Sequence, residues 1–140
     1  MDARWAPGQL IPTDLDLIRE CCLCDRFFDL YVNAPMGTIV TDKLRPEQQR
    51  DPLGVARAKA QLETAYAIAD DWLRQGPWAL GEAFTLADCG AAPGLYYANQ
   101  VVPFGQAYQR LSEYFARLRE RPSYARVFEE SKPYLAMFPR

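Results

Sequence analysis

The segment from Phe84 to Val101, FTLADCGAAPGLYYANQV, constrains the fold more than any other part of this sequence. Thr85 and Asp88 have the Thr-x-x-Asp spacing of a capping box, in which each side chain accepts a hydrogen bond from a backbone amide at the start of a helix. The nine residues after Asp88, from Cys89 to Tyr97, carry no charge. A helix without a polar face is expected to be surrounded by other elements. We therefore predict a buried helix that begins at this box and is kinked at Pro93.

The first half of the chain has the periodicity of two long helices. Thr13, with Asp16 three residues later, is predicted to cap the first helix, which we expect to end near residues 33–37, NAPMG. Pro52 suits the first turn of a second helix, which should continue as far as Gly76. On the first helix, the residues that lie within about 60° of one line and should face the core are Leu17, Cys21, Cys24, Phe28, Tyr31 and Val32.

The second half of the chain continues the helical pattern after the capped helix. An amphipathic helix that includes Tyr108 should end before Pro122, and Ser123 is predicted to cap a shorter one. No stretch alternates with period two for long enough to form a sheet. We predict an all-α domain at residues 13–140, a bundle of five or six helices, preceded by a linker rich in Pro and Gly at residues 1–12.

The charges exclude several classes of partner. The chain has 16 basic and 18 acidic side chains, a net charge of -2, and no run of Lys or Arg that could follow a phosphate backbone. We expect no binding to nucleic acid or to membranes, and from the apolar pattern we predict neither a spanning segment nor a signal peptide. A cytosolic protein is the simplest interpretation. The sequence has no histidine, which removes Ser/His and Cys/His nucleophile pairs and the commonest zinc ligand. We predict neither a catalytic residue nor a metal site.

Three of the four cysteines fall within four positions, at Cys21, Cys22 and Cys24. Cys21 and Cys24 share the core stripe, whereas Cys22 is rotated by about 100°, so the three sulfur atoms do not converge as metal ligands would. We interpret the cluster mainly as core packing by small apolar thiols. A metal site and a reactive surface thiol at Cys22, acting as a sensor, are the alternatives.

A second apolar line on the same helix comprises Leu23, Phe27 and Leu30, at spacings i, i+4 and i+7. It lies well over 90° from the core stripe. One explanation is a central helix that is buried on both faces. The other, which we favour, is that these three residues form a contact face for a second domain or subunit.

The capping box, the uncharged helix after it and the closing segment YFARLRERPSYARVFEE together resemble the C-terminal, all-helical domain of bacterial glutathione S-transferases. The resemblance runs from LIPTD at residues 10–14 to RPSYARV at residues 121–127 and covers nearly the whole chain. It implies a structural role for Thr85 and Asp88 rather than a catalytic one. It also implies that LIPTD is an interdomain linker.

The resemblance implies a function that this chain shares with a second domain. In the family, a thioredoxin-like domain holds glutathione and activates its thiol, and the residues before 12 are too few to form such a domain. The helical domain would supply the wall of the pocket for a small hydrophobic electrophile and part of a homodimer interface. By position, the residues that resemble this wall are Phe28, Tyr31, Pro35 and Met36. For each of them, plain core packing is the alternative.

These implications set the expected role of the chain. Glutathione would be the cosubstrate of the full-length family in detoxification, while the 140-residue chain alone binds no cofactor and is expected to be inactive. Its partner would be a second copy or the missing thioredoxin-like domain. The alternative function is a non-catalytic helical module for protein interaction, as in related domains of the translation machinery.

Overall fold

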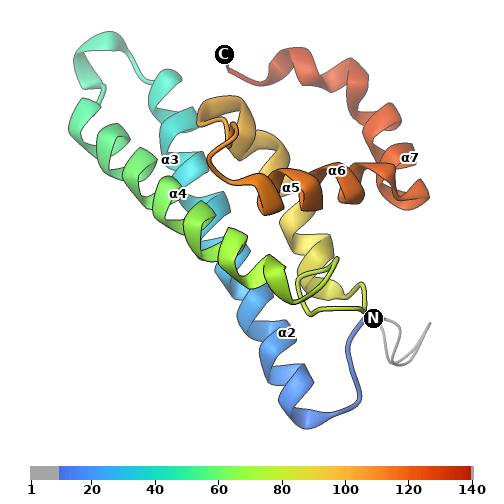
Figure 1. The fold of residues 1–140 in the computed structure, drawn as a ribbon. Coiled ribbons are helices and arrows are strands. Elements are labelled where there is room, and N and C mark those ends of the chain that lie inside the picture. Colours follow the sequence, from blue (N-terminus) through green and yellow to red (C-terminus); the bar gives the residue numbers. More distant parts are fainter. Residues whose placement is uncertain (1–9, 140) are drawn as a thin grey trace.

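The computed structural model describes residues 10–139, which form a bundle of helices (Figure 1). Residues 1–9 of the predicted linker lie outside the described part. No β-strand occurs in residues 10–139, and none of their helices is long and apolar enough to cross a membrane. The predicted all-α fold is therefore confirmed. The α-helices are α2 (Leu15–Phe27), α3 (Ala34–Lys43), α4 (Pro52–Trp72), α5 (Leu86–Val101), α6 (Gln109–Glu120) and α7 (Pro122–Ser131). A π-helical segment spans Phe28–Asn33, and 3-10 turns span Glu47–Gln49, Leu73–Gln75 and Lys132–Met137.

The first helix is longer than predicted, because the π-helical segment joins α2 to α3 in one continuous rod (Figure 1). Within it, the Ala34 amide donates to the carbonyl of Asp29, five residues earlier. The prediction that the helix ends near residues 33–37 was wrong. Pro35 would crowd the carbonyl of Tyr31 in a regular α-helix, and the wider turn just before it relieves this conflict.

The N-terminal cap of α2 also differs from the prediction. Asp14, not Thr13, is the capping residue, and its Oδ1 accepts hydrogen bonds from the amides of Asp16 and Leu17 at 3.0 and 3.1 Å. Both residue types are good caps, and sequence spacing alone did not separate them.

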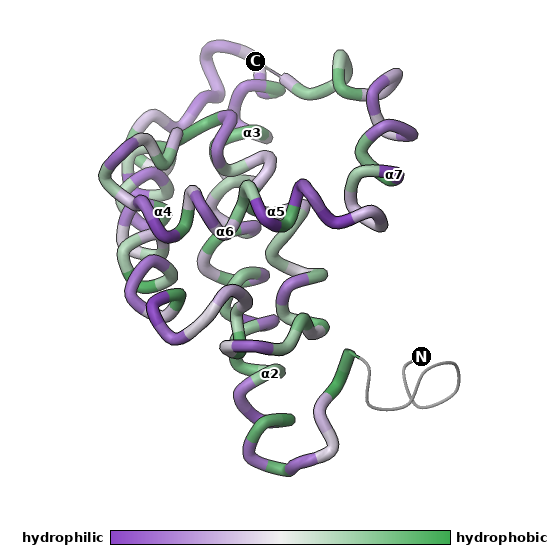
Figure 2. Tube along the Cα trace, turned by 45° about the vertical axis from the view of Figure 1, so that its right-hand side comes forward, coloured by the Kyte–Doolittle hydropathy of each residue, from purple (hydrophilic) through white to green (hydrophobic). Residues whose placement is uncertain are grey.

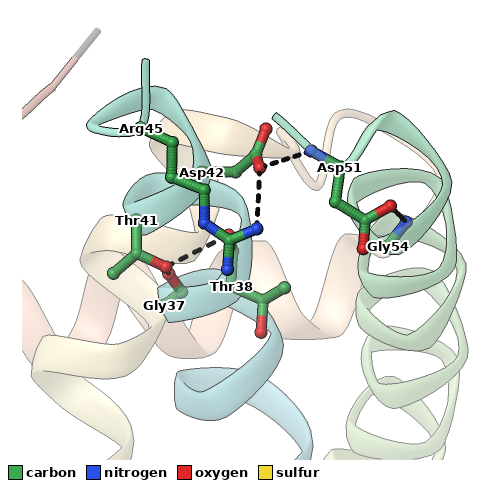
Figure 3. Close-up of polar contacts among 7 residues, drawn as sticks. All are labelled: Gly37, Thr38, Thr41, Asp42, Arg45, Asp51 and Gly54. Carbon is green, nitrogen blue, oxygen red and sulfur yellow. Dashed lines mark hydrogen bonds and ion pairs between the residues drawn. The ribbon is translucent and has the colours of Figure 1, made fainter. Parts of the chain in front are cut away.

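The turn between α3 and α4 is fixed by two aspartates (Figure 3). Asp42 is buried, and its Oδ1 accepts the Asp51 amide at 2.8 Å and lies 3.5 Å from the Arg45 guanidinium. Asp51 in turn caps α4 by accepting the Gly54 amide at 2.8 Å. Pro52 occupies the first turn of α4, as predicted. These contacts let α4 run back beside α3 (Figure 1).

Helix α5 packs against α2, the π-helical segment, α3 and α6. The face that meets these elements is closed: the side chains of Ala87, Asp88, Ala91, Leu95 and Ala98 have no exposed surface. Helix α7 packs on α6, and its backbone lies farther from that of α5 (Figures 1 and 2), to which it is joined by the rings of Phe128 and Tyr96, 5.3 Å apart.

Two predictions about these C-terminal helices were wrong. Cys89, Gly90 and Pro93 are exposed, so α5 is not surrounded on every side. Ser123 does not cap α7, because Pro122 takes the first helical position and Arg121 is the capping residue. A proline at the first position needs no hydrogen-bond partner for its nitrogen, which favours this start over one at Ser123.

Candidate functional site

The structure does not place the four residues predicted for the wall of an electrophile pocket on one exposed surface. Phe28, Pro35 and Met36 are buried in the bundle, whereas Tyr31 is 57% exposed. The ring of Phe28 stacks on Tyr114 in the core, with a centroid distance of 6.4 Å. The Tyr31 ring instead lies on Phe27 at the surface, at 5.6 Å. Of the four, Tyr31 alone presents most of its side chain to solvent.

The π-helical segment explains why Tyr31 left the predicted core stripe. A π turn holds about one residue more than an α turn, so the residues after it are rotated backwards around the axis. Val32 keeps its predicted place on the buried side, which Met36 and Ile39 continue. The predicted stripe follows from a rotation of 100° per residue, which holds only for a regular α-helix. Leu17, the other stripe residue that is exposed, lies in the first turn of α2, at the end of the rod.

The predicted contact face of Leu23, Phe27 and Leu30 is divided in the structure. Leu23 and Leu30 are 61% and 58% exposed, but Phe27 is only 7% exposed. The Phe27 ring packs 4.6 Å from that of Trp72, at the end of α4. The prediction that Phe27 faces outward was therefore wrong, because a partner distant in sequence covers it.

The cysteines do not form a metal centre. Cys21 and Cys24 are buried beside Ala87, Cys22 and Cys89 are exposed, and all four are free thiols. Residues 10–139 contain no group of three or more His, Cys, Asp or Glu side chains that could hold a metal ion. Burial, and then the neighbouring Cys21, raise the pKa of the Cys24 thiol to about 11. Cys89 is only partly exposed to water, and desolvation by its neighbours, followed by the Asp88 carboxylate, raises its pKa, which makes this thiol a poor nucleophile at neutral pH.

The capping box is present, and Asp88 connects it to a larger network of buried hydrogen bonds. Asp88 Oδ2 accepts the Thr85 amide at 2.7 Å and the Thr85 hydroxyl at 3.2 Å. Its Oδ1 accepts the Ala79 amide and the Tyr114 hydroxyl, both at 2.8 Å. Burial, together with the Asp88 charge and hydrogen bond, raises the pKa of Tyr114 well above its usual value. The Asp88 carboxylate thus joins the start of α5 to the loop at Ala79 and to Tyr114 of α6, and its four contacts are all structural.

An open cavity lies between α5 and α7, on the face of α5 that is not closed. Its volume is about 420 Å³, which is in the range of small-molecule sites. Sequence reasoning missed it, although the uncharged face of α5 and the aromatic residues of α7 were both visible. The cavity is lined by Phe84, Asp88, Cys89, Ala92, Pro93, Tyr96, Tyr97, Leu118, Arg121, Ser123, Tyr124, Val127, Phe128 and Ser131.

Arg121 is the one cationic residue in this lining. Its guanidinium carbon lies 3.5 Å from the ring centroid of Phe84 and 5.5 Å from that of Trp78. The aromatic faces hold the cation by electrostatic attraction to their π electrons. The Nε atom of Arg121 is buried and has no hydrogen-bond partner among the described residues.

Comparison with known proteins identifies the helical bundle. The family "Glutathione S-transferase, C-terminal domain" matches residues 27–122, well over half of the chain. Glutathione S-transferase A from Pleuronectes platessa is 32% identical over 80 residues, which are 56% of this chain and 36% of that protein.

Several solved structures have the same fold. A glutathione S-transferase from Methylobacillus flagellatus, solved with glutathione bound, superposes with a TM-score of 0.80 at 24% identity. The match covers 89% of this chain and 62% of that one. Gtt2 from Saccharomyces cerevisiae superposes with a TM-score of 0.75 at 20% identity, over 89% of this chain and 63% of that one. The chain thus spans about a third of the curated relative and about three fifths of these structures.

Proposed function

Because this chain belongs to the family of glutathione S-transferase C-terminal domains, we propose that it acts as the helical half of a glutathione transferase. In this role it presents an apolar surface to a small hydrophobic electrophile. A thioredoxin-like domain supplies the glutathione and activates its thiol. The match of the family to residues 27–122 is the observation that carries this proposal.

The surface that would meet the electrophile is centred on Tyr31. Its ring is exposed and is supported by Phe27, which in turn packs on Trp72. Phe28, Pro35 and Met36 lie behind it in the core, where they hold the rod of α2 and α3 in place. An aromatic ring held in this way can pack against a flat apolar substrate at little entropic cost.

The described residues give no support for thiol activation by the helical half itself. The sequence lacks histidine, and the buried carboxylate of Asp88 is committed to four structural hydrogen bonds. We therefore expect glutathione to be held and activated elsewhere. The free cysteines fit a reducing compartment, and we propose the cytosol.

A second copy of the chain is the partner that we propose for the exposed edge of α2. Leu23 of α2 and Leu30 of the π-helical segment that continues it remain more than half exposed. A two-fold pairing through the same patch closes on itself and leaves no open end. Leu30→Glu should then convert a dimer into a monomer in a sedimentation experiment. Leu53→Glu, at a residue of α4 with 62% exposure, is the matched control.

The catalytic proposal is tested by joining a thioredoxin-like domain to the helical domain. The segment that precedes the helical domain in the Methylobacillus flagellatus transferase is fused in front of residue 10. Conjugation of glutathione to an aryl halide is then measured. We expect no activity above buffer from the 140-residue chain alone and measurable activity from the chimaera. A chimaera that binds glutathione but conjugates no aryl halide would contradict the proposal.

The role of Tyr31 is tested in the same chimaera. Tyr31→Ala should raise the KM for the aryl halide several-fold and leave the affinity for glutathione unchanged, since the ring would contact only the electrophile. Leu44→Ala, at an exposed apolar residue near the end of the rod, is the control and should change neither. Equal effects of the two substitutions would show that Tyr31 has no special role.

A further inference from the structure

The cavity between α5 and α7 has no part in the proposed function. Its walls are mostly apolar side chains and aromatic rings. An open apolar surface of this kind is usually covered by another molecule or by another segment of the same chain. The occupant should also offer a hydrogen-bond acceptor to Arg121, because the buried Nε atom of this residue has no acceptor among the described residues.

One end of the cavity lies beside the first described residues of the chain. The amide of Leu86, in the first turn of α5, donates a hydrogen bond to the carbonyl of Leu10 at 2.9 Å. Phe84 and Cys89, on either side of Leu86 in the sequence, both line the cavity. The peptide bond between residues 9 and 10 therefore lies near the edge of the cavity.

Residues 1–9 are long enough to follow the cavity along α5. From Leu86 to Tyr97, the last α5 residue of the lining, the helix rises by about 16 Å. An extended chain covers about 3.3 Å per residue, so the stretch from Trp5 to Leu10 spans up to about 16 Å. The Trp5 side chain is thus within reach of any part of the cavity wall on α5.

The sequence of residues 1–9, MDARWAPGQ, suits an apolar groove. In an extended segment, successive side chains point to opposite sides. Up to Pro7, one side then carries only apolar residues, which are Met1, Ala3, Trp5 and Pro7. The two charged residues, Asp2 and Arg4, fall on the opposite side. Pro7 favours an extended conformation at the residue before it and has a carbonyl but no amide donor to satisfy.

We propose that residues 1–9 bind in the cavity between α5 and α7 of the same chain. The indole of Trp5 packs among the rings of the cavity, and a backbone carbonyl of the segment accepts the hydrogen bond from Arg121 Nε. The hydrogen bond at Leu86, the apolar lining and the alternating pattern carry this proposal together. It is independent of the transferase role, because the chimaera that tests that role lacks residues 1–9.

Alkylation of the surface thiols tests the proposal in the 140-residue chain. Cys89 lines the cavity, whereas Cys22 lies at the surface outside it. The chain and its Trp5→Ala variant are treated with iodoacetamide, and the rate at each cysteine is followed by mass spectrometry of the peptides. We expect Trp5→Ala to raise the rate at Cys89 at least about threefold, because a released segment no longer covers this thiol, and to leave the rate at Cys22 unchanged. Equal changes at both thiols, or no change at Cys89, would overturn the proposal.

Two further variants show whether the indole ring is responsible. Arg4→Ala, at the neighbouring residue on the opposite side of the segment, should leave both rates unchanged. Trp5→Phe should keep most of the protection of Cys89, because it retains an aromatic ring. The buried thiols of Cys21 and Cys24 should stay unreactive, so that a gain confined to Cys89 reports a local opening. Loss of protection in Arg4→Ala, or a Trp5→Phe variant as reactive as Trp5→Ala, contradicts the proposal.

Dilution distinguishes this occupant from a second copy of the chain. Protection by the segment of the same chain does not depend on protein concentration, because the contact is intramolecular. We expect the rate at Cys89 to stay constant over a hundredfold dilution. A rate that rises on dilution would refute the intramolecular contact and show that the segment of one copy enters the cavity of another.

Discussion

Helix α5 packs into the bundle on one face and borders an open cavity on the other, although after Asp88 its sequence carries no charge on either. The closed face carries Ala87, Ala91 and Ala98, which let neighbouring helices approach closely and leave no exposed surface. The open face carries Cys89, Pro93 and the rings of Tyr96 and Tyr97, with α7 on the far side of the cavity. An uncharged helix surface thus indicates apolar surroundings, and a ligand or another chain segment can provide these as well as a core can.

The largest expected effect concerns the closed face. Asp88→Ala should lower the free energy of unfolding by about 4 kcal/mol, because it leaves the Tyr114 hydroxyl and the amides of Thr85 and Ala79 without acceptors in a buried place. A capping box alone would account for about 1 to 2 kcal/mol. Urea unfolding measures the difference. Asp16→Ala, at an exposed carboxylate of α2, is the control and should change the free energy of unfolding little. If Asp88→Ala costs no more than the loss of a simple cap, the hydrogen bonds of Asp88 to Ala79 and Tyr114 do not contribute to stability as we expect.

The second effect compares how easily the closed and the open face of α5 admit a larger side chain. Ala91→Leu should destabilise the fold by about 2 to 3 kcal/mol, because Ala91 has no exposed surface and its neighbours must move to admit the added atoms. Cys89→Leu adds a similar side chain on the open face and should change the free energy of unfolding by less than about 0.5 kcal/mol. Equal losses in thermal unfolding would contradict the distinction between the faces.

The third effect is an alkaline loss of stability from the thiol that packs beside Ala87. The folded-state pKa of Cys24 is about 11 against an ordinary value of 9.0, so its contribution is complete below pH 9 and is lost as the pH rises towards 11. We expect the free energy of unfolding to fall by about 1 kcal/mol by pH 10. Above pH 10, the raised pKa values of Tyr66 and Tyr114 add to the fall.

Substitutions at the two neighbouring cysteines check this assignment. Cys24→Ala should remove most of the fall between pH 9 and 10, measured by urea unfolding at each pH. Cys22→Ala should keep it, because Cys22 is exposed. An unchanged slope in Cys24→Ala would assign the loss to other groups.

The smallest effect tests whether the closed face is full at every position. A methyl group at Gly94 would lie 3.8 Å from Asn33 Cβ and 3.9 Å from Val32 Cγ1, which are ordinary contacts. Gly94→Ala should therefore stabilise the fold by about 0.5 kcal/mol through its better helix propensity. At Gly90 the same atom would lie 2.7 Å from the Asp25 carboxylate, which must move, so Gly90→Ala should gain less. Destabilisation by Gly94→Ala would show that the glycine is needed for close packing.

The capping box shows how much of the fold could be read from the sequence. Thr85 and Asp88 are three residues apart, so their contact depends only on local geometry, and the helix starts where the box predicts. Pro52 at the start of α4 and the end of α6 before Pro122 follow equally from the chemistry of proline. The all-α architecture was predictable because helical periodicity is likewise a local feature of the sequence.

The candidate sites depended on contacts that the sequence does not display. Phe27 is covered by Trp72, and the two are far apart along the chain. Tyr31 is exposed because a π turn before Pro35 rotates the helix, whereas the apolar spacing predicts its place with the α-helical period. The cavity requires Arg121 and Tyr124 to stand across from Cys89 and Pro93, an arrangement set by the angle between α6 and α7.

By itself, the sequence determined the features that arise within a few residues: the helical class, the starts and stops at caps and prolines, and the resemblance carried by the segment around Thr85 and Asp88. Backbone hydrogen bonds and caps act over one or two turns, so local spacing specifies them. Only the tertiary structure decided which uncharged faces are closed, which rings are exposed and where a cavity opens. Those outcomes depend on how helices distant in sequence pack, because burial is a property of the assembled surfaces and not of any one helix.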